Sequence, residues 1–306
     1  MLTKMLVATL ILFVLSALNG YASEKKREAN CTLIVGADLR FAAQLNTELF
    51  HHVLAVNALG EHRRIDGVVL ATDLFDNAPP KLLDFYRQRW ERGADYRQIH
   101  YDTFPTFATL DGMAADERPA EMRIGMEFNL HYLDSMLLDM KNAGRILAIH
   151  RSSRSYSFDL GGVHFVCGQL AAGDTTYGES NMQWIAADLR RYAIDGRPVV
   201  YVQHYGFDAQ SRERWSEAQR AELFDILEQY NLAAVFVGYT PNGATQRYRD
   251  VTIHQMPNMG CGVEDRPLFD VLQIKGRRVT VERFAIVDNE GRTERVEDAS
   301  AHATIA

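Results

Sequence analysis

The sequence predicts an α/β protein (α+β in its last third). Through the first half of the chain, short continuous apolar runs alternate with segments whose apolar residues recur at helical spacing. Strands that are apolar throughout need cover on both faces, as the strands of parallel sheets do. The last third alternates apolar and polar residues, which is typical of an antiparallel meander. Because no linker divides these parts, we expect a single domain.

Each element is predicted by its own segment. Strands are expected at the apolar runs 31–37, 67–71, 104–110, 155–159, 163–169, 198–203 and 233–237. Helices are expected where the spacing is helical, at 41–59, 79–90, 133–142, 182–192 and 211–231. The pair Gly161-Gly162 separates two strands and predicts a hairpin.

The N-terminal segment predicts export. Lys4 precedes an apolar run that ends in Asn19-Gly20-Tyr21-Ala22, the pattern of a signal peptide cleaved after Ala22. We therefore expect a secreted or periplasmic protein without a membrane span after cleavage. An uncleaved anchor is the alternative, but the run is shorter than the ~20 residues that a spanning helix needs. The expected organisation is a signal peptide at 1–22, a linker at 23–30, the folded domain at 31–287 and a loosely held polar tail at 288–306.

Composition excludes some classes of function. Of the 306 residues, 47% are hydrophobic and 24% are charged, which suffices for a large core. The net charge of −7 lacks the basic footprint of a nucleic-acid-binding protein. Cys31, Cys167 and Cys261 do not have the spacing of a zinc site. They form either one disulfide and a free thiol, or three buried small hydrophobic groups, and we favour the second.

Acidic residues and a histidine follow the apolar strands. Asp38, Asp73, Asp76 and His204 stand just past predicted strand ends, which is where ligands bind in α/β sheets. A single aspartate in such a place is more often a helix cap or a turn residue. Their recurrence on successive strands indicates a site.

The order and surroundings of these residues resemble the calcineurin-like metallophosphoesterases, from Thr32 to Phe284. That family's frame is D-x-H, GD-xx-D, GNH-D/E, a lone His and GH-x-H. The segment "VVLATDLFDN" is similar to the family's "VVxxGDLxDN", while "YSFDLGGVHFV" and "VVYVQHYGFD" with the later Trp215 resemble one branch. The resemblance implies a four-layer αββα sandwich of two mixed sheets, with the site at the strand ends.

The resemblance also implies a chemistry. In this family two divalent ions flank a phosphate, polarise its oxygens and generate a hydroxide nucleophile. Asp38, Asp73 and His204 match ligand positions. Other ligand positions hold residues of a different kind, namely Arg40, Gly112, Met113, Tyr239 and Pro241. Because Met113 stands at the position of the family's leaving-group acid, that acid is missing too. Two protein ligands per ion are few, so we expect either no metal or a single Mn, Fe, Zn or Mg ion.

Arg40 is the most informative of these differences. A guanidinium is permanently cationic and forms bidentate pairs with carboxylates. We hypothesise that Arg40 replaces the first ion and pairs with Asp38 and Asp73; the alternative is that it extends into solvent. Around it, Asp76, Asn77 and Tyr239 are expected to contact a substrate or ligand, with Tyr239 as a further possible oxygen ligand for the second ion.

Other histidines have blander interpretations. His51 and His52 are expected on the surface of the first helix. His164, in the hairpin, is expected to be a hydrogen-bonded structural residue, and His254 lacks ligand-like spacing.

Two classes of function follow. The first is a degenerate, non-catalytic family member that binds a phosphate-containing small molecule or a protein partner. The second is an active phosphoesterase with altered metal use through Asp73, Asp76, His204 and Tyr239. We favour the first, because losing both metal ligands and the proton donor removes two separate contributions to the rate.

Overall fold

The chain folds around two mixed β-sheets. The structure, a computed structural model, describes residues 28–37, 48–72, 80–107, 120–176, 178–209, 211–238, 245–257, 259 and 266–305. In spatial order the six-stranded sheet contains β13 (Thr293–Thr304), β12 (Arg278–Ile286), β11 (Leu268–Lys275), β1 (Asn30–Ala37), β2 (Gly67–Thr72) and β3 (Thr103–Phe107). Strands β1, β2 and β3 are parallel, and the other neighbours are antiparallel.

The seven-stranded sheet has the same mixed character. In spatial order it contains β4 (Ala148–His150), β5 (Ser155–Leu160), β6 (Val163–Cys167), β7 (Val199–Gln203), β8 (Leu232–Val237), β10 (Val251–Gln255) and β9 (Gln246–Tyr248). Strands β6, β7, β8 and β10 run parallel, and the predicted hairpin is formed by β5 and β6.

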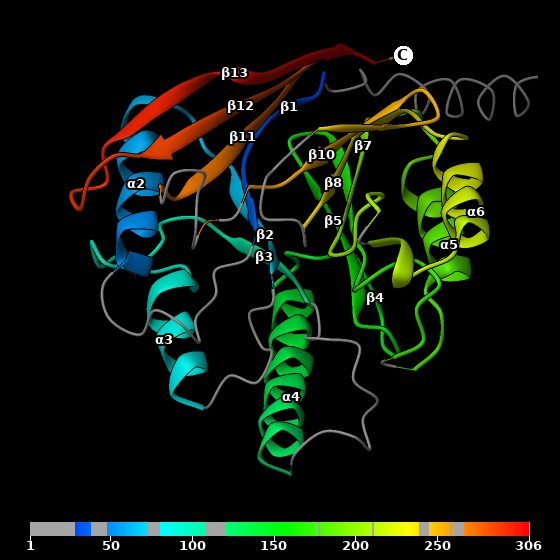
Figure 1. Cartoon of the computed structure of the whole chain (residues 1–306), viewed down its shortest axis with the longest axis horizontal. Helices are drawn as coiled ribbons and strands as arrows, with labels where there is room; N and C mark the ends of the chain where they lie inside the picture. The colour runs from blue at the N-terminus through cyan, green and yellow to red at the C-terminus, as the bar shows by residue number, and fades with distance from the viewer. Residues whose placement is uncertain are drawn as a thin grey trace, which may run out of the picture.

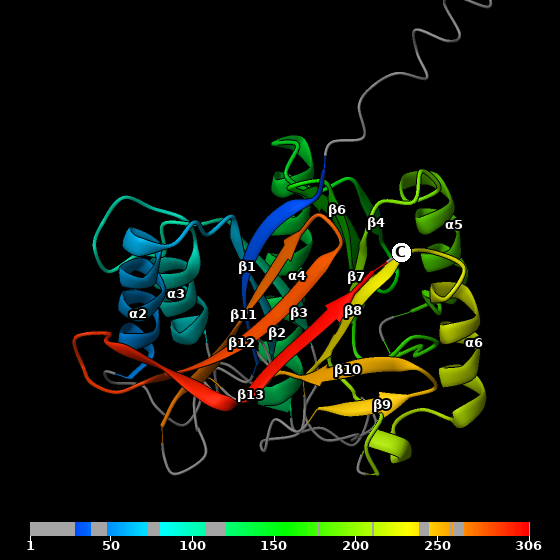
Figure 2. The same ribbon diagram turned by 90° about the horizontal axis from the view of Figure 1, so that it is seen from above.

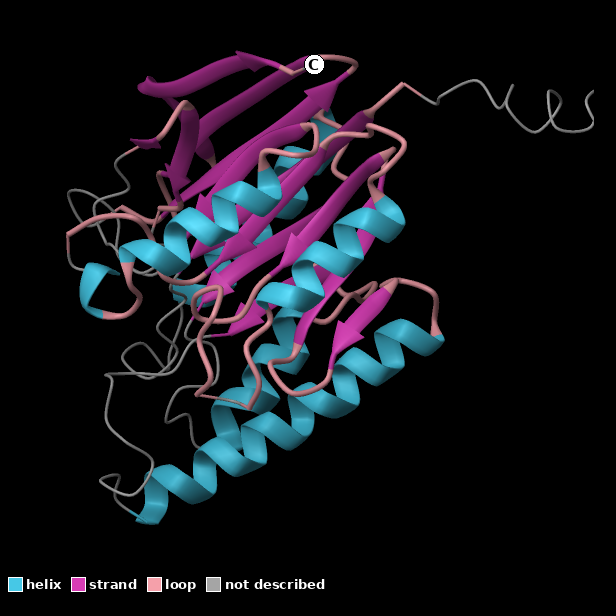
Figure 3. Cartoon of the chain, turned by 90° about the vertical axis from the view of Figure 1, so that its right-hand side faces the viewer, coloured by secondary structure: helices cyan, strands magenta, loops and turns pink. Residues whose placement is uncertain are grey.

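Helices cover the outer faces of both sheets. The α-helices of the described residues are α2 (Glu48–His62), α3 (Pro80–Trp90), α4 (Ala120–Asn142), α5 (Met182–Tyr192) and α6 (Glu217–Leu227). Helices α2 and α3 lie outside the six-stranded sheet, and α5 and α6 lie outside the seven-stranded sheet (Figures 1 and 3). The predicted four-layer αββα sandwich is confirmed. None of the helices in the described part of the chain is both long and apolar enough to cross a membrane.

The core fills the spaces between these layers. Between the two sheets, the Phe104 ring of β3 stacks on the Phe158 ring of β5 with centroids 3.8 Å apart. Outside the seven-stranded sheet, Ile185 of α5 and Leu223 of α6 are fully buried. Full burial of such side chains contributes about 1.5–3 kcal/mol each. Helix α6 begins at a capping box in which the Ser216 side chain accepts from the Gln219 backbone.

Two elements differ from expectation. Helix α4 begins at Ala120, well before the predicted start at 133. The segment expected as a loosely held tail contains β13, which pairs antiparallel with β12. An edge strand needs only one partner and little apolar surface, so its polar sequence does not resemble that of the buried strands. Strands β13 and β12 lie side by side in Figure 2.

The cysteines agree with the second of the two alternatives as far as they are described. Cys31 and Cys167 are free thiols and are buried. Burial raises the pKa of both, that of Cys167 to about 12, so they behave as small hydrophobic groups. Cys261 lies outside the described residues.

Candidate functional site

The carboxyl ends of strands from both sheets meet at one place. Strands β1 and β2 end in register, with Ala37 beside Ala71, and β7 and β8 end with Gln203 beside Val237. Gly238 joins the two sets of strand ends. A Cβ atom placed on Gly238 would lie 2.9 Å from the Ala71 carbonyl oxygen and 3.3 Å from His204 Nδ1. The ends of β2, β7 and β8 therefore enclose one small region.

His204 lies in this region, one residue past the end of β7. Its side chain is 1% exposed. The imidazole meets the Tyr205 ring edge-on, with centroids 4.9 Å apart. Tyr205 is in turn covered by the Arg214 guanidinium, 5.7 Å from the ring centroid. These contacts fix the orientation of the imidazole beside the end of β2.

Hydrogen bonds hold the loop that follows His204. Trp215 Nε1 donates to the Gly206 carbonyl over 2.9 Å, and the Gly206 amide donates to Ser211 Oγ over 3.0 Å. Ser211 Oγ donates to Asp208 Oδ2 over 2.8 Å. Trp215 therefore holds the segment "HYGFD" in place from nine residues beyond Gly206. This hydrogen bond gives a structural reason why the segment and Trp215 occur together in the sequence.

Two buried glutamines support the same region, and the sequence analysis missed both. Gln203 Oε1 accepts from the Tyr201 hydroxyl and the Ala172 amide, at 2.9 and 3.2 Å. Gln255 Nε2 donates to the carbonyl of Gly238. Each glutamine ends an apolar strand, and that is the only sequence signal that could have identified them.

His164 is held by carboxylates on both sides. Its Nδ1 lies 2.7 Å from Asp159 Oδ1 and its Nε2 lies 2.8 Å from Asp188 Oδ2. Ser157 Oγ donates to the other oxygen of Asp188 over 2.7 Å. Burial alone would lower the pKa of His164, but the hydrogen bonds to Asp159 and Asp188 raise it. The prediction of a hydrogen-bonded structural histidine is confirmed.

The expectation for His52 is wrong, because this side chain is fully buried. It lies on the same face of α2 as Ala55 and Val56, which are also fully buried. The helical spacing of these three residues turns them toward the sheet together. Its neighbour His51 is partly exposed.

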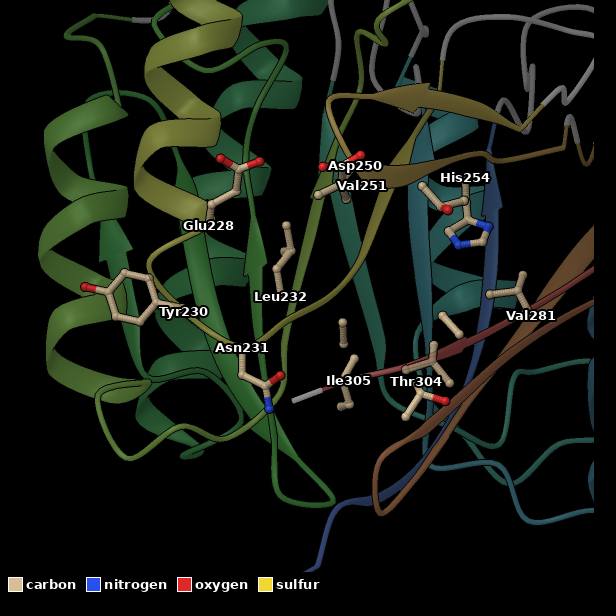
Figure 4. Close-up of a pocket in the computed structure, with 14 residues that line it drawn as sticks. Glu228, Tyr230, Asn231, Leu232, Asp250, Val251, His254, Val281, Thr304 and Ile305 are labelled. Carbon is tan, nitrogen blue, oxygen red and sulfur yellow. The ribbon is translucent and has the colours of Figure 1, made fainter.

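A cavity of about 350 Å³ lies away from the strand ends (Figure 4). It is lined by Leu232 and Ala233 at the start of β8, whereas Gly238 follows the end of that strand. His254 also lines the cavity. Burial, and to a smaller extent the positive charge of Arg283, lowers the pKa of His254 to about 4. This imidazole is therefore neutral at physiological pH. Because Leu232 and Ala233 begin β8, most of the cavity lies toward the end of the sheet opposite His204.

Comparisons with known proteins identify the fold. No protein-family model matches the chain, and no curated protein matches its sequence. Among solved structures, a dimetal phosphatase from Danio rerio superimposes with a TM-score of 0.61 at 11% identity, over 91% of this chain and 100% of that one. The chain has the calcineurin-like metallophosphoesterase fold. The purple acid phosphatase PPD1 from yellow lupin (Lupinus luteus) gives a TM-score of 0.60 at 13% identity, over 91% of this chain and 54% of that one.

A third structure with this fold is described in other terms. GAP50, "the anchor in the inner membrane complex of Plasmodium", gives a TM-score of 0.55 at 10% identity, over 88% of this chain and 89% of that one. At these identities the likeness establishes the metallophosphoesterase fold alone. The resemblance inferred from the sequence is confirmed at that level.

Most of the predicted site residues lie outside the described residues, namely Asp38, Arg40, Asp73, Asp76, Asn77 and Tyr239. The family ligand positions held by Gly112, Met113 and Pro241 lie outside them too. In the sequence, Asp38 directly follows β1, Asp73 follows β2, and Tyr239 follows Gly238. These strand ends are the ones that meet at His204.

The described residues do not by themselves fit the metal pair of a metallophosphoesterase. Across the described ranges, no three histidine, cysteine, aspartate or glutamate side chains are grouped so that they could hold an ion. His204 offers one imidazole, whereas zinc in proteins takes about four ligands.

Proposed function

We propose that this chain is an exported phosphoesterase-fold protein whose dinuclear metal site is eroded. In this proposal it is catalytically impaired and binds a phosphate-containing small molecule or protein partner at the strand ends. The metallophosphoesterase fold supports the class of ligand. The Plasmodium structure described as an anchor supports a binding role for the same fold.

One observation carries the proposal. The strand ends meet around His204, a family ligand position, with the close approach of Gly238 to the end of β2. Yet the sequence replaces ligand types at Arg40, Met113 and Tyr239. The strand ends keep their arrangement while the residues at the metal-ligand positions have changed. This combination favours binding over metal-dependent hydrolysis.

Arg40 gives the proposed site its charge. A guanidinium between Asp38 and Asp73 would neutralise carboxylates that otherwise share a metal. It would also leave N–H donors for a phosphate oxygen, which Arg contacts bidentately. The experiment is the Arg40→His variant, which restores the family's D-x-H. We expect it to retain more manganese after dialysis than the wild type, and equal retention would contradict this role for Arg40.

A second candidate is an active phosphoesterase with altered metal use. It is favoured by the order around His204, where Trp215, Gly206 and Ser211 hold the following loop by hydrogen bonds. In that case Asp73 and His204 would be essential. One assay distinguishes the two candidate functions.

That assay is hydrolysis of an aryl phosphate in manganese by the wild type and by Asp73→Asn. We expect the wild type to hydrolyse the aryl phosphate no faster than Asp73→Asn does, because the proton donor and most metal ligands are missing. Turnover by the wild type that is lost in Asp73→Asn would establish the second candidate instead. Export is tested separately by N-terminal sequencing of the mature protein, which we expect to begin at Ser23.

A further inference from the structure

A second cavity lies between α3 and α4, which run beside each other in Figure 1. Its volume is about 420 Å³, which lies within the range of small-molecule sites. Trp90, the last residue of α3, and Thr103, the first residue of β3, line it. Because β3 begins here, the cavity lies at the amino end of the parallel strands, away from the ends that meet at His204.

Two buried donors in its lining lack an acceptor. Trp90 is fully buried and Thr103 is 7% exposed. Within the part of the chain that the structure describes, Trp90 Nε1 and Thr103 Oγ1 have no hydrogen-bond partner. An indole N–H can only donate, and leaving a buried donor unsatisfied costs free energy. The lining therefore favours a ligand that brings hydrogen-bond acceptors.

Two guanidinium groups add donors to the same lining. Arg92 and Arg145 both contact the carboxylate of Asp102, with N–O distances of 3.5 and 3.3 Å. Each guanidinium has five N–H donors, and these long contacts join only one nitrogen of each to Asp102. The Arg92 and Arg145 side chains are 60% and 36% exposed, so their remaining donors face solvent and are accessible to a ligand. Guanidinium groups suit planar oxyanions.

The acidic groups of the lining limit the charge of the ligand. Glu91 accepts from the Tyr132 hydroxyl and lies 3.5 Å from Arg87, so its charge is balanced within the lining. Asp139 is exposed and would repel a polyanion. A ligand with one oxyanion group is therefore better matched than a highly charged one.

From these observations we propose that the cavity between α3 and α4 binds a small molecule carrying one carboxylate or phosphate group. The oxyanion accepts from Trp90 Nε1, Thr103 Oγ1 and the two guanidinium groups. The site is separate from the one proposed at the strand ends and does not depend on that function.

The test is thermal unfolding of the wild type and of Thr103→Val in sodium phosphate, sodium acetate and sodium chloride at equal ionic strength. Valine keeps the shape of threonine and removes the hydroxyl. In chloride we expect Thr103→Val to melt at or above the wild type, because an unsatisfied group has been removed. In phosphate or acetate we expect the wild type to gain stability and the variant to gain clearly less. The anion that acts identifies the chemistry of the ligand.

Further variants locate the effect. Arg145→Gln should weaken the apparent affinity about tenfold, as loss of a charge-assisted hydrogen bond does. The matched control Arg64→Gln, at an exposed arginine that pairs with Asp66, should leave it unchanged. His204→Asn should retain the anion effect, which separates this cavity from the strand ends. If neither anion stabilises the wild type, or if Thr103→Val keeps the full shift, the proposal is wrong.

Discussion

Gly238 is a residue whose lack of a side chain decides local geometry. A Cβ atom there would approach the backbone oxygen of Ala71 to 2.9 Å, a contact that real Cβ atoms essentially never show. The nearest atom belongs to a β-strand, so it cannot move away cheaply.

We therefore expect Gly238→Ala to lower the free energy of unfolding by about 1–3 kcal/mol through overpacking. Chemical denaturation measures this. Gly93→Ala is a suitable control, because the atoms nearest to its new Cβ belong to the far end of the flexible Gln98 side chain. Equal stability of the two variants would show that the ends of β2 and β8 are not packed as described.

His164 is a titratable residue whose side chain is fully buried. A neutral imidazole can donate from only one nitrogen, whereas both of its nitrogens face carboxylate oxygens at 2.7 and 2.8 Å. This geometry favours the protonated form of the ring, in agreement with its raised pKa.

This raised pKa gives stability a definite pH dependence. The contribution is fully present below the unfolded pKa of about 6.5 and is lost as the pH rises through the higher folded pKa. We expect the free energy of unfolding of the wild type to fall over that range, and His164→Asn to lose this slope. Urea unfolding at a series of pH values measures it, with His131→Asn at an exposed position of α4 as the control. The interpretation fails if His164→Asn retains the slope of the wild type.

Single residues were predictable from the sequence only where a strand end marks them. His204 follows an apolar strand directly and could be assigned to the strand ends. Gln255 also ends a strand, but its partner could not be assigned, because Gln255 reaches the carbonyl of Gly238 from a neighbouring strand. The burial of His52 likewise depends on which elements pack together. A local pattern carries no signal for such contacts.

The β5–β6 hairpin is the element whose sequence and structure agree most closely. Its turn residue Gly161 has φ +58°, and its carbonyl accepts from the Asn30 amide over 2.8 Å. A Cβ atom on Gly161 would lie 2.3 Å from the Asn30 carbonyl oxygen. The hairpin turn of one sheet thus contacts the start of β1 in the other.

Gly161→Ala should therefore lower the free energy of unfolding by more than the strain of a positive φ alone would. Gly144 provides a matched comparison, because its φ is +69° but nothing lies within 4 Å of its Cβ position. We expect Gly144→Ala to cost about 1–2 kcal/mol from backbone strain and Gly161→Ala about 1–3 kcal/mol more from the clash. Thermal unfolding of both variants measures the difference, and similar losses would argue against the contact with Asn30.

Among the elements, continuous apolar strands and helices with helical spacing were predictable, while the edge strand was not. The strand β13 lies at the edge of its sheet and has less apolar sequence than the central strands. The start of α4 differs for another reason, because its apolar residues alternate with other residues instead of recurring at helical spacing. The predicted signal peptide and linker remain predictions, whereas β13 extends the fold beyond the predicted domain end at 287.

In the whole molecule, the residues that build the layers of the sandwich are different from the residues at the metal-ligand positions. Apolar strands and their covering helices build the two-sheet sandwich, whereas ligands are single residues at strand ends. The first can persist while the second change. The fold was therefore predictable from the sequence, while the place of the site and the roles of Asp38, Arg40, Asp73 and Tyr239 remain proposals.

We propose above all that this metallophosphoesterase fold carries an eroded metal site. The most direct test is the metal content of the purified protein after incubation with manganese and dialysis, measured by elemental analysis. We predict at most one weakly held ion per chain and a melting temperature that a chelator does not change. A tightly held pair of ions, removed by chelator with loss of stability, would contradict the claim.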